Sequence, residues 1–242
     1  MITTMRAARV MAITTITMTD PGEAALYRLM AWLSPSYPVG AFSYSHGLEQ
    51  LVEDGAIADL PSLVDRVTDI LTLGGGRSDA IVFACAHRAA SAGDQAALES
   101  IRERAIALAG GAERHLETTA QGAAFRDITV RTWDAPTLAS LGGTIPYPVA
   151  VAIACADHGI ALHPALGACV HGFAANLVSA AVRLVPLGHS DGQRSLRALE
   201  PAVARAVAEA LIAPIEAAGG ITVLAEMAAM RHETQYTRLF RT

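Results

Sequence analysis

Two long windows without a single Asp, Glu, Lys or Arg residue restrict most strongly what this chain can fold into. They cover residues 135–156 and 159–182. A helix that crosses a membrane needs about 20 mostly apolar residues, and both windows are long enough. However, glycines and prolines interrupt the first window, and histidines and an asparagine make the second more polar. We therefore expect helices buried on all sides within a soluble bundle, and no membrane partner.

The rest of the chain also favours helices. Of its 242 residues, 52% are hydrophobic but only 5% are aromatic, so the core must consist mainly of alanine, leucine and valine. Strands prefer β-branched and aromatic side chains, whereas helices accept alanine and leucine readily. Apolar residues recur at helical spacing after two candidate N-caps, Asp59 and Asp94. We predict an all-α fold, a single helical-bundle domain of about nine or ten helices.

Prolines, glycines and apolar spacing predict individual helices. The first begins after Asp20 with Pro21 and carries an apolar stripe that should face the core. We expect a later helix to be interrupted at Gly122 and another to be bent or split at Pro201. The stripe consists of Leu26, Leu29, Met30 and Leu33, and the long helices are expected at 113–133, 147–157, 164–184 and 190–213.

The predicted organisation has three parts. Residues 1–20 are expected to be disordered or a non-native start, because several methionines within them could begin translation. Residues 21–230 form the helical domain, and residues 231–242 form a tail that docks partners. Three cysteines without a C-x-x-C pair suit a reducing compartment, which predicts a cytoplasmic protein. The net charge of −5, without a basic stripe, argues against a nucleic-acid partner.

The stretch 32–49, WLSPSYPVGAFSYSHGLE, has an unusual composition. Pro35 and Pro38 must end the incoming helix, and Gly40 allows a turn. We expect Ser43 or Ser45 to cap a new helix that continues to Glu53. Such a loop either packs against the body or presents itself to a partner, and we favour presentation.

Catalytic interpretations of this stretch are weak. Ser43, Ser45 and His46 are neighbours, but no G-x-S-x-G pattern surrounds them and capping explains the serines better. Glu49 and its acidic neighbours resemble an ordinary solvated helix end. The triple glycine 74–76 lacks the G-K-[ST] of a phosphate loop. These patterns give no support for catalysis, although a small-molecule enzyme on a helical scaffold stays a rival interpretation.

A metal site is a second possibility. Cys155 and His158 are three residues apart, and His163 follows shortly after them. Nickel accepts thiolate and imidazole ligands, so these residues could serve a nickel-binding metallochaperone. Because the spacing is not that of a dedicated site, core packing or capping is the favoured interpretation.

The C-terminal tail is the best interaction candidate. Tyr236, Leu239 and Phe240 would form an apolar stripe on a helix, beside Arg238 and other arginines. Aromatic residues with arginine are typical of interface hot spots. The alternative is a frayed, solvated terminus.

Three segments together resemble the UreF family of urease accessory proteins. They are SPSYPVGAFSYSHGLE at 34–49, VRLVPLG at 182–188 with Gly192-Gln193 after it, and RHETQYTRLFRT at 231–242. They occur in the order and at the spacing of that family. The resemblance covers roughly residue 23 to the C-terminus.

The resemblance implies an all-α homodimer without catalytic activity. It would assist nickel insertion into apo-urease by binding UreD (UreH in some species) and the GTPase UreG. Nickel would be handled through these partners, with no cofactor bound stably. Glu49, Arg183 and Arg238 would contact or gate UreG, and the tail would order when UreD binds. The candidate partner-binding residues are Phe42, Ser45, His46, Glu49, Arg183, Tyr236, Arg238 and Phe240.

Overall fold

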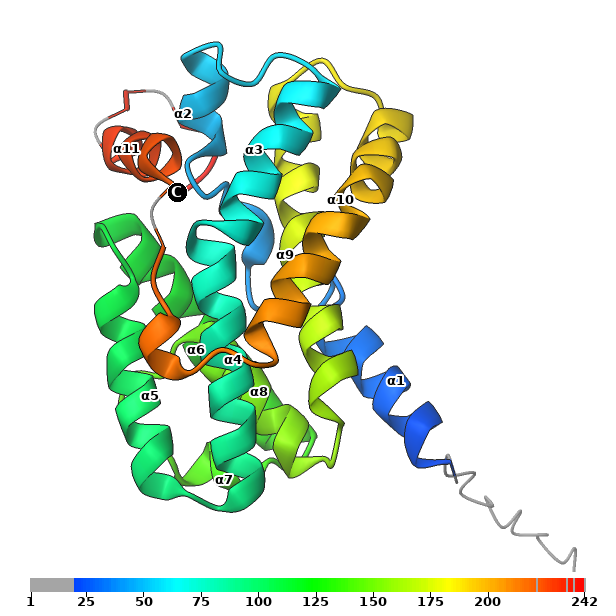
Figure 1. The fold of residues 1–242 in the computed structure, drawn as a ribbon, viewed down its shortest axis with the longest axis vertical. Helices are drawn as coiled ribbons and strands as arrows, with labels where there is room; N and C mark the ends of the chain where they lie inside the picture. Colours follow the sequence, from blue (N-terminus) through cyan, green and yellow to red (C-terminus); the bar gives the residue numbers. More distant parts are fainter. Residues whose placement is uncertain (1–19, 221, 234, 237, 242) are drawn as a thin grey trace, which may run out of the picture.

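The structure is a computed structural model that describes residues 20–220, 222–233, 235–236 and 238–241. These residues form α-helices and two short 3-10 helices but no strand, which confirms the all-α prediction (Figure 1). Except for Asp20, the predicted N-terminal segment lies outside the described residues. The longer helices are α1 (Pro21–Trp32), α3 (Leu60–Thr72), α4 (Gly75–Ala92), α5 (Gln95–Leu108), α6 (Ala112–Thr132), α8 (Tyr147–Asp157), α9 (Leu162–Leu184), α10 (His189–Ala210) and α11 (Val223–His232). The short elements are η1 (Ala41–Ser43), α2 (Leu48–Glu53), α7 (Pro136–Ser140) and η2 (Ile215–Ala217).

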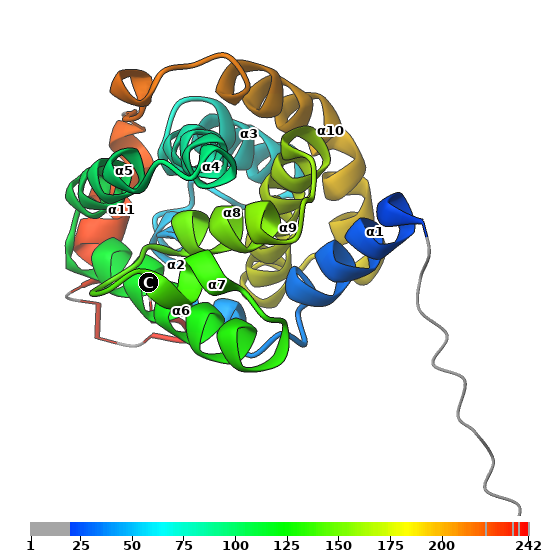
Figure 2. The same cartoon turned by 90° about the horizontal axis from the view of Figure 1, so that it is seen from below.

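Helix α8 occupies the middle of the bundle. It contacts α4, α5, α6, α7 and α9, and Figure 2 shows it between α4 and α6. Every residue from 148 to 155 is buried. A charged side chain without a partner would be costly there, which explains the first charge-free window. The predicted range 147–157 is confirmed.

Helix α9 contains most of the second window. By length and composition alone, it is the one helix of the described chain that could cross a membrane, a test that core helices also pass. It packs against α2, α3, α4, α8 and α10, yet His163, His171 and Ser179 are exposed. The expectation of burial on all sides is therefore wrong for α9, which is a core helix with an open face.

The signature segment, residues 34–49, connects α1 to α2 by turns and η1. Gly40 has a left-handed backbone with φ of 74°. The predicted serine cap is correct only in part, because α2 begins at Leu48, behind Gly47, but Oγ of Ser45 accepts the amide of Glu49 in its first turn at 3.4 Å. His46 and Gly47 have φ angles of 59° and 77°, and two consecutive left-handed residues cannot belong to a right-handed helix.

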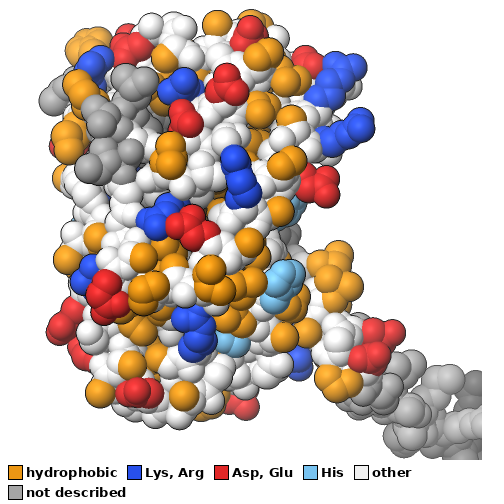
Figure 3. All heavy atoms as spheres, in the orientation of Figure 1, with side chains coloured by type: hydrophobic (Ala, Val, Ile, Leu, Met, Phe, Trp, Pro, Cys, Tyr) orange, Lys and Arg blue, Asp and Glu red, His pale blue; other side chains and the backbone are white. Residues whose placement is uncertain are grey.

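Helix α1 projects from the body, anchored at its C-terminal end. Trp32 is fully buried and packs edge-on against Phe125 and Trp133. The predicted core stripe of α1 is wrong in part, because Leu26 and Met30 are 59% and 68% exposed. Figure 3 shows apolar side chains on the outside of this projecting region.

Helix α6 is not interrupted at Gly122, and helix α10 is not split at Pro201. Helix α6 runs straight through Gly122, where an added Cβ would lie 1.9 Å from the carbonyl oxygen of Ile145. The absence of a side chain at Gly122 therefore allows α6 to approach the backbone of the segment before α8 closely. Helix α10 continues through Pro201, which is exposed, so water can satisfy the carbonyl freed by the missing N–H.

The triple glycine also has a packing role. A Cβ on Gly74 would lie 2.5 Å from Oγ1 of Thr222, and one on Gly76 would lie 3.0 Å from the ring of Phe173. The first distance is shorter than real Cβ contacts, and the second is tighter than most of them, so a larger residue at either position would require a neighbour to shift. Helix α4 begins at Gly75, within the triple glycine.

Candidate functional site

The C-terminal tail lies against the signature segment. The docked tail comprises the described residues 235, 236 and 238–241, which follow α11 and are not helical. Helix α11 itself packs on α2 and α6. The amide of Arg241 donates to the carbonyl oxygen of Ser43 at 2.8 Å. The two segments that the sequence singled out therefore form one surface, although about 190 residues separate them in the chain.

Glu49 of α2 holds the docked tail. Its Oε1 accepts the amide of Leu239 at 2.7 Å, and its Oε2 accepts the amide of Phe240 at 2.9 Å. Glu49 is buried, with 7% of its surface exposed. The prediction of a solvated helix end is therefore wrong for Glu49, because its carboxylate satisfies backbone donors of a distant segment.

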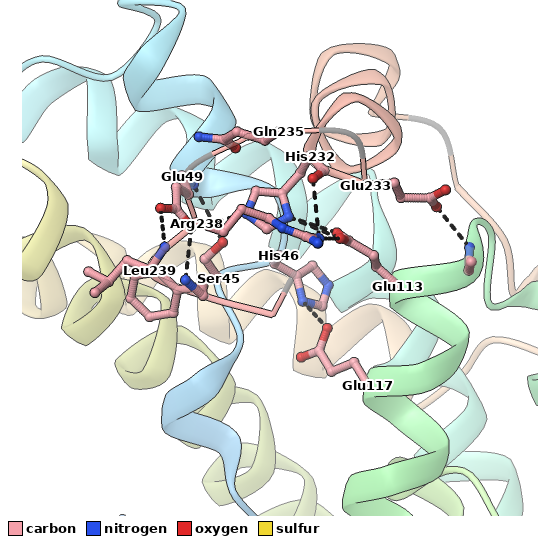
Figure 4. Close-up of polar contacts among 12 residues, drawn as sticks. Ser45, His46, Glu49, Glu113, Glu117, His232, Glu233, Gln235, Arg238 and Leu239 are labelled. Carbon is pink, nitrogen blue, oxygen red and sulfur yellow. Dashed lines mark hydrogen bonds and ion pairs between the residues drawn. The ribbon is translucent and has the colours of Figure 1, made fainter.

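His232, the last residue of α11, bridges two carboxylates (Figure 4). Its Nε2 lies 3.0 Å from Oε2 of Glu49, and its Nδ1 lies 2.9 Å from Oε2 of Glu113 in α6. The imidazole is fully buried. Arg238 of the tail donates to Oε1 of Glu113 at 2.9 Å. Charged groups of α2, α6, α11 and the tail thus form one connected network.

Arg183 covers the end of the tail. Its guanidinium carbon lies 4.4 Å from the ring centroid of Phe240, and its Nη2 donates to the carbonyl oxygen of Phe42 at 2.9 Å. Burial lowers the pKa of Arg183 from its usual value. Phe240 is buried at 4% exposure, while Phe42 is 64% exposed. Arg183 therefore ties the family-like segment 182–188 to both other segments.

A second charged cluster lies behind the signature segment. Nδ1 of His46 lies 3.2 Å from Oε2 of Glu117, which also accepts Nη1 of Arg114 at 2.7 Å. Burial raises the pKa of Glu117, but His46 and Arg114 lower it more strongly, to about 2. Ser45 and His46 are both buried, so neither presents its side chain to solvent.

Two cavities flank this cluster. One of about 210 Å³ is lined by His46, Asp79 and Arg114, among others, and one of about 300 Å³ lies between the signature segment and α9. Asp79 borders both cavities, and burial raises its pKa despite Arg114 at 3.4 Å. The larger cavity is lined mainly by apolar and aromatic side chains, such as Phe83 and Phe173.

Several apolar side chains of α11 and the docked tail are exposed to solvent. The predicted helical stripe in the tail is wrong, because residues 238–241 are extended or bent and Phe240 points inward. Tyr236 and Leu239 point outward, with exposures of 103% and 64%. Met227 and Met230 of α11 are also exposed.

The candidate metal ligands occupy different environments. Cys155 is fully buried in the core, and the ring of His158 packs edge-on against Trp32 at 5.1 Å. His163 is exposed at the start of α9. Within the part of the chain that the structure describes, no three His, Cys, Asp or Glu residues are arranged to hold a metal ion.

Sequence reasoning missed Glu113, Glu117, Arg114 and the bridging role of His232. The sequence HETQY at 232–236 differs from an H-E-x-x-H metal motif, because Tyr236 stands at the second histidine position. No local signal identifies these residues, because the partners of His232 lie 119 and 183 residues away. The one hint available in the sequence would have been an acidic residue, such as Glu113, on the side of α6 that is buried.

The fold and the site define an all-α protein whose C-terminal tail is docked on a proline-broken loop and displays an apolar outer face. The chain belongs to the UreF family, whose family model, UreF, matches residues 57–200. It is 51% identical over 233 residues to "Urease accessory protein UreF" of Rhodopseudomonas palustris strain BisA53, covering 92% of this chain and 98% of that protein. Proteins of the same name from Methylorubrum populi and Bradyrhizobium diazoefficiens are each 49% identical, covering 88% and 90% of this chain and 97% and 92% of their own lengths.

Proposed function

We propose that this chain acts in urease maturation as a non-catalytic scaffold in the cytoplasm. Its surface would bind UreD (UreH) and recruit the GTPase UreG on apo-urease. Nickel would be handled through these partners, without a cofactor held stably by this chain. The relatives' shared name, urease accessory protein, supports the biological context.

The observation that carries the proposal is the orientation of neighbouring tail residues. Glu49 and Arg183 fix Phe240 inward, and the same arrangement leaves Leu239 and Tyr236 outward. An apolar strip that stays exposed is typical of an interaction site. Arginines 231, 238 and 241 adjoin it, and aromatic residues with arginine favour a partner whose apolar pocket is bordered by carboxylates.

In this proposal the predicted site residues have two kinds of role. Phe42, Tyr236 and Arg238 are accessible to a partner. Ser45, His46, Glu49 and Phe240 are buried and would act by holding the surface in shape. Arg183 joins both sets, since it contacts Phe42 and Phe240.

Helix α1 supports the proposed homodimer. Leu26, Tyr27 and Met30 are 59%, 59% and 68% exposed on a helix that projects from the body. A second copy that covers this apolar face would remove it from water. Light scattering of wild type and of Met30→Asp tests this, and a wild-type monomer at micromolar concentration would contradict it.

The scaffold proposal is tested by co-expression with the urease operon partners. Leu239→Asp should lower partner recovery in a pull-down and urease activation at least tenfold, because a charge would enter an apolar contact. Ile212→Asp is the matched control, since Ile212 is an 85% exposed apolar residue on another surface. Wild-type complex formation and activation by Leu239→Asp would refute the proposal. Calorimetry with nickel on the isolated chain tests the nickel-carrier alternative.

A further inference from the structure

The larger of the two cavities, which measures about 300 Å³, has the size of a site for a small organic molecule. Pockets for such ligands begin at about this volume, and an apolar cavity of about half that volume already accepts benzene. The cavity can therefore enclose a ring together with a short chain of atoms. Aromatic side chains form much of its wall, and they are Trp32, Tyr37, Phe42, Phe83, Tyr147 and Phe173.

Asp79 of α4 contributes a carboxylate to the same wall. Its side chain is 37% exposed, although burial raises its pKa. The two observations agree because Asp79 borders both cavities, so the exposed part of the side chain faces internal space. A carboxylate that protein surrounds but does not cover is accessible to a ligand within the cavity.

The charge of Asp79 is incompletely paired. Its Oδ2 lies 3.4 Å from Nη2 of Arg114, which is a long contact. Arg114 makes a shorter contact of 2.7 Å with Oε2 of Glu117, and Oε1 of Glu117 accepts Nε2 of Gln121 at 3.2 Å. Both oxygens of Glu117 are therefore satisfied. By contrast, no donor within the described ranges of the chain reaches Oδ1 of Asp79.

A cationic group would complete this site. An ammonium group carries both a positive charge and the N–H donors that Oδ1 of Asp79 lacks. The aromatic rings of the wall also attract cations through their π faces. An anion would meet the carboxylates of Asp79 and Glu117, which already share Arg114. His46, which also contacts Glu117, lines the smaller cavity and not this one.

We propose that this cavity binds a small organic cation, an ammonium group on an apolar body about as large as an aromatic ring, with Asp79 as its anchor. The positive group would contact Oδ1 of Asp79, and the body would lie among the aromatic side chains. The bound cation would favour the ionised form of Asp79, because it supplies the opposite charge that offsets burial. This binding is a property of the chain alone and goes beyond its proposed part in urease maturation.

Calorimetric titration of the full chain with phenethylamine, a cation at neutral pH, tests the charge preference. Its neutral counterpart, phenethyl alcohol, and its anionic counterpart, phenylacetate, have nearly the same body. The cation should bind at least tenfold more tightly than the alcohol, and phenylacetate should bind most weakly. Comparable affinities for the cation and the alcohol, a preference for phenylacetate, or no binding of the cation at millimolar concentration would overturn the proposal.

The variant Asp79→Asn tests the anchor, because it keeps the shape of the side chain and removes its charge. It should weaken the binding of phenethylamine at least tenfold and change the binding of phenethyl alcohol less than twofold. Asp69→Asn is the matched control, since Asp69 is a partly exposed aspartate of α3 that pairs with Arg66, and it should bind like wild type. Unchanged affinity of Asp79→Asn for the cation would show that Asp79 is not the anchor.

A second measurement needs no variant and so covers the case in which Asp79→Asn does not fold. In wild-type protein, nuclear Overhauser effects should connect the ring protons of bound phenethylamine with those of Phe83 and Phe173. Contacts confined to another part of the protein, such as the exposed face of α1, would refute the site.

Discussion

Nδ1 of His46 lies 3.2 Å from Oε2 of Glu117, with both side chains almost fully buried. This pair joins the signature segment to α6 beneath the surface that carries the tail. The signature histidine therefore has a buried partner on α6 within the protein.

Glu117→Gln should destabilise the protein in a pH-dependent way. The pKa of Glu117 is lowered from 4.5 to about 2, so its ionised form stabilises the fold above pH 4.5, and this contribution disappears as the pH falls toward 2. The shift corresponds to roughly 3 kcal/mol at neutral pH. Urea unfolding at several pH values should show a deficit in Glu117→Gln that shrinks in acid.

The matched control is Glu99→Gln, which removes an exposed carboxylate paired with Arg102. Because solvent screens this pair, unfolding should change little at any pH. A similar loss of stability in both variants would contradict the special role of Glu117.

Alanine substitutions at two helical glycines should have opposite effects. At Gly122 the new Cβ would lie 1.9 Å from the carbonyl oxygen of Ile145, so α6 or the segment before α8 must move, at a cost of about 3 kcal/mol or more. At Gly167 of α9 nothing lies within 4 Å, and alanine should stabilise the helix by about 0.5–1 kcal/mol. Thermal unfolding followed by circular dichroism measures both, and equal midpoints would count against the packing described for α6.

Substitutions at two adjacent tail residues should distinguish docking of the tail on the body from binding of a partner. Phe240→Ala removes a buried ring, which should weaken docking by roughly 3 kcal/mol and expose the tail amides to exchange. Leu239→Ala should leave tail exchange unchanged, because its side chain is 64% exposed and its amide still donates to Glu49. Mass-spectrometric hydrogen exchange of the C-terminal peptide gives the readout. If both variants protect the tail equally, Phe240 does not anchor it.

All three thiols should react slowly in the native protein. Burial raises the pKa of Cys85 and Cys155, and raises that of Cys169 to about 12. At pH 8 only about one Cys169 side chain in ten thousand is then a thiolate, the reactive form. Labelling with Ellman's reagent should be slow without denaturant and rapid in urea. Rapid native labelling of one thiol would show that its surroundings are open.

Local signals were sufficient for many helices. Asp59 accepts the amide of Ser62 as an N-cap, and the apolar residues that recur at helical spacing after it, Leu63, Val67, Ile70 and Leu71, are buried. Asp94 caps α5. Such features depend on residues three or four apart, which a sequence displays directly. The prediction at Gly122 was wrong because the sequence does not distinguish a glycine that ends a helix from one that lets a neighbouring backbone approach closely.

The sequence by itself determined that the chain is helical, that α8 is buried and that the signature segment and the tail are special, because spacing, capping and composition are local properties. Only the tertiary structure decided that these two segments bind each other and that Glu49, Phe240 and His232 face inward. Those outcomes depend on a carboxylate of α6 and a helix end more than a hundred residues away. Burial and charge pairing across such distances arise from packing, which no short stretch of sequence encodes.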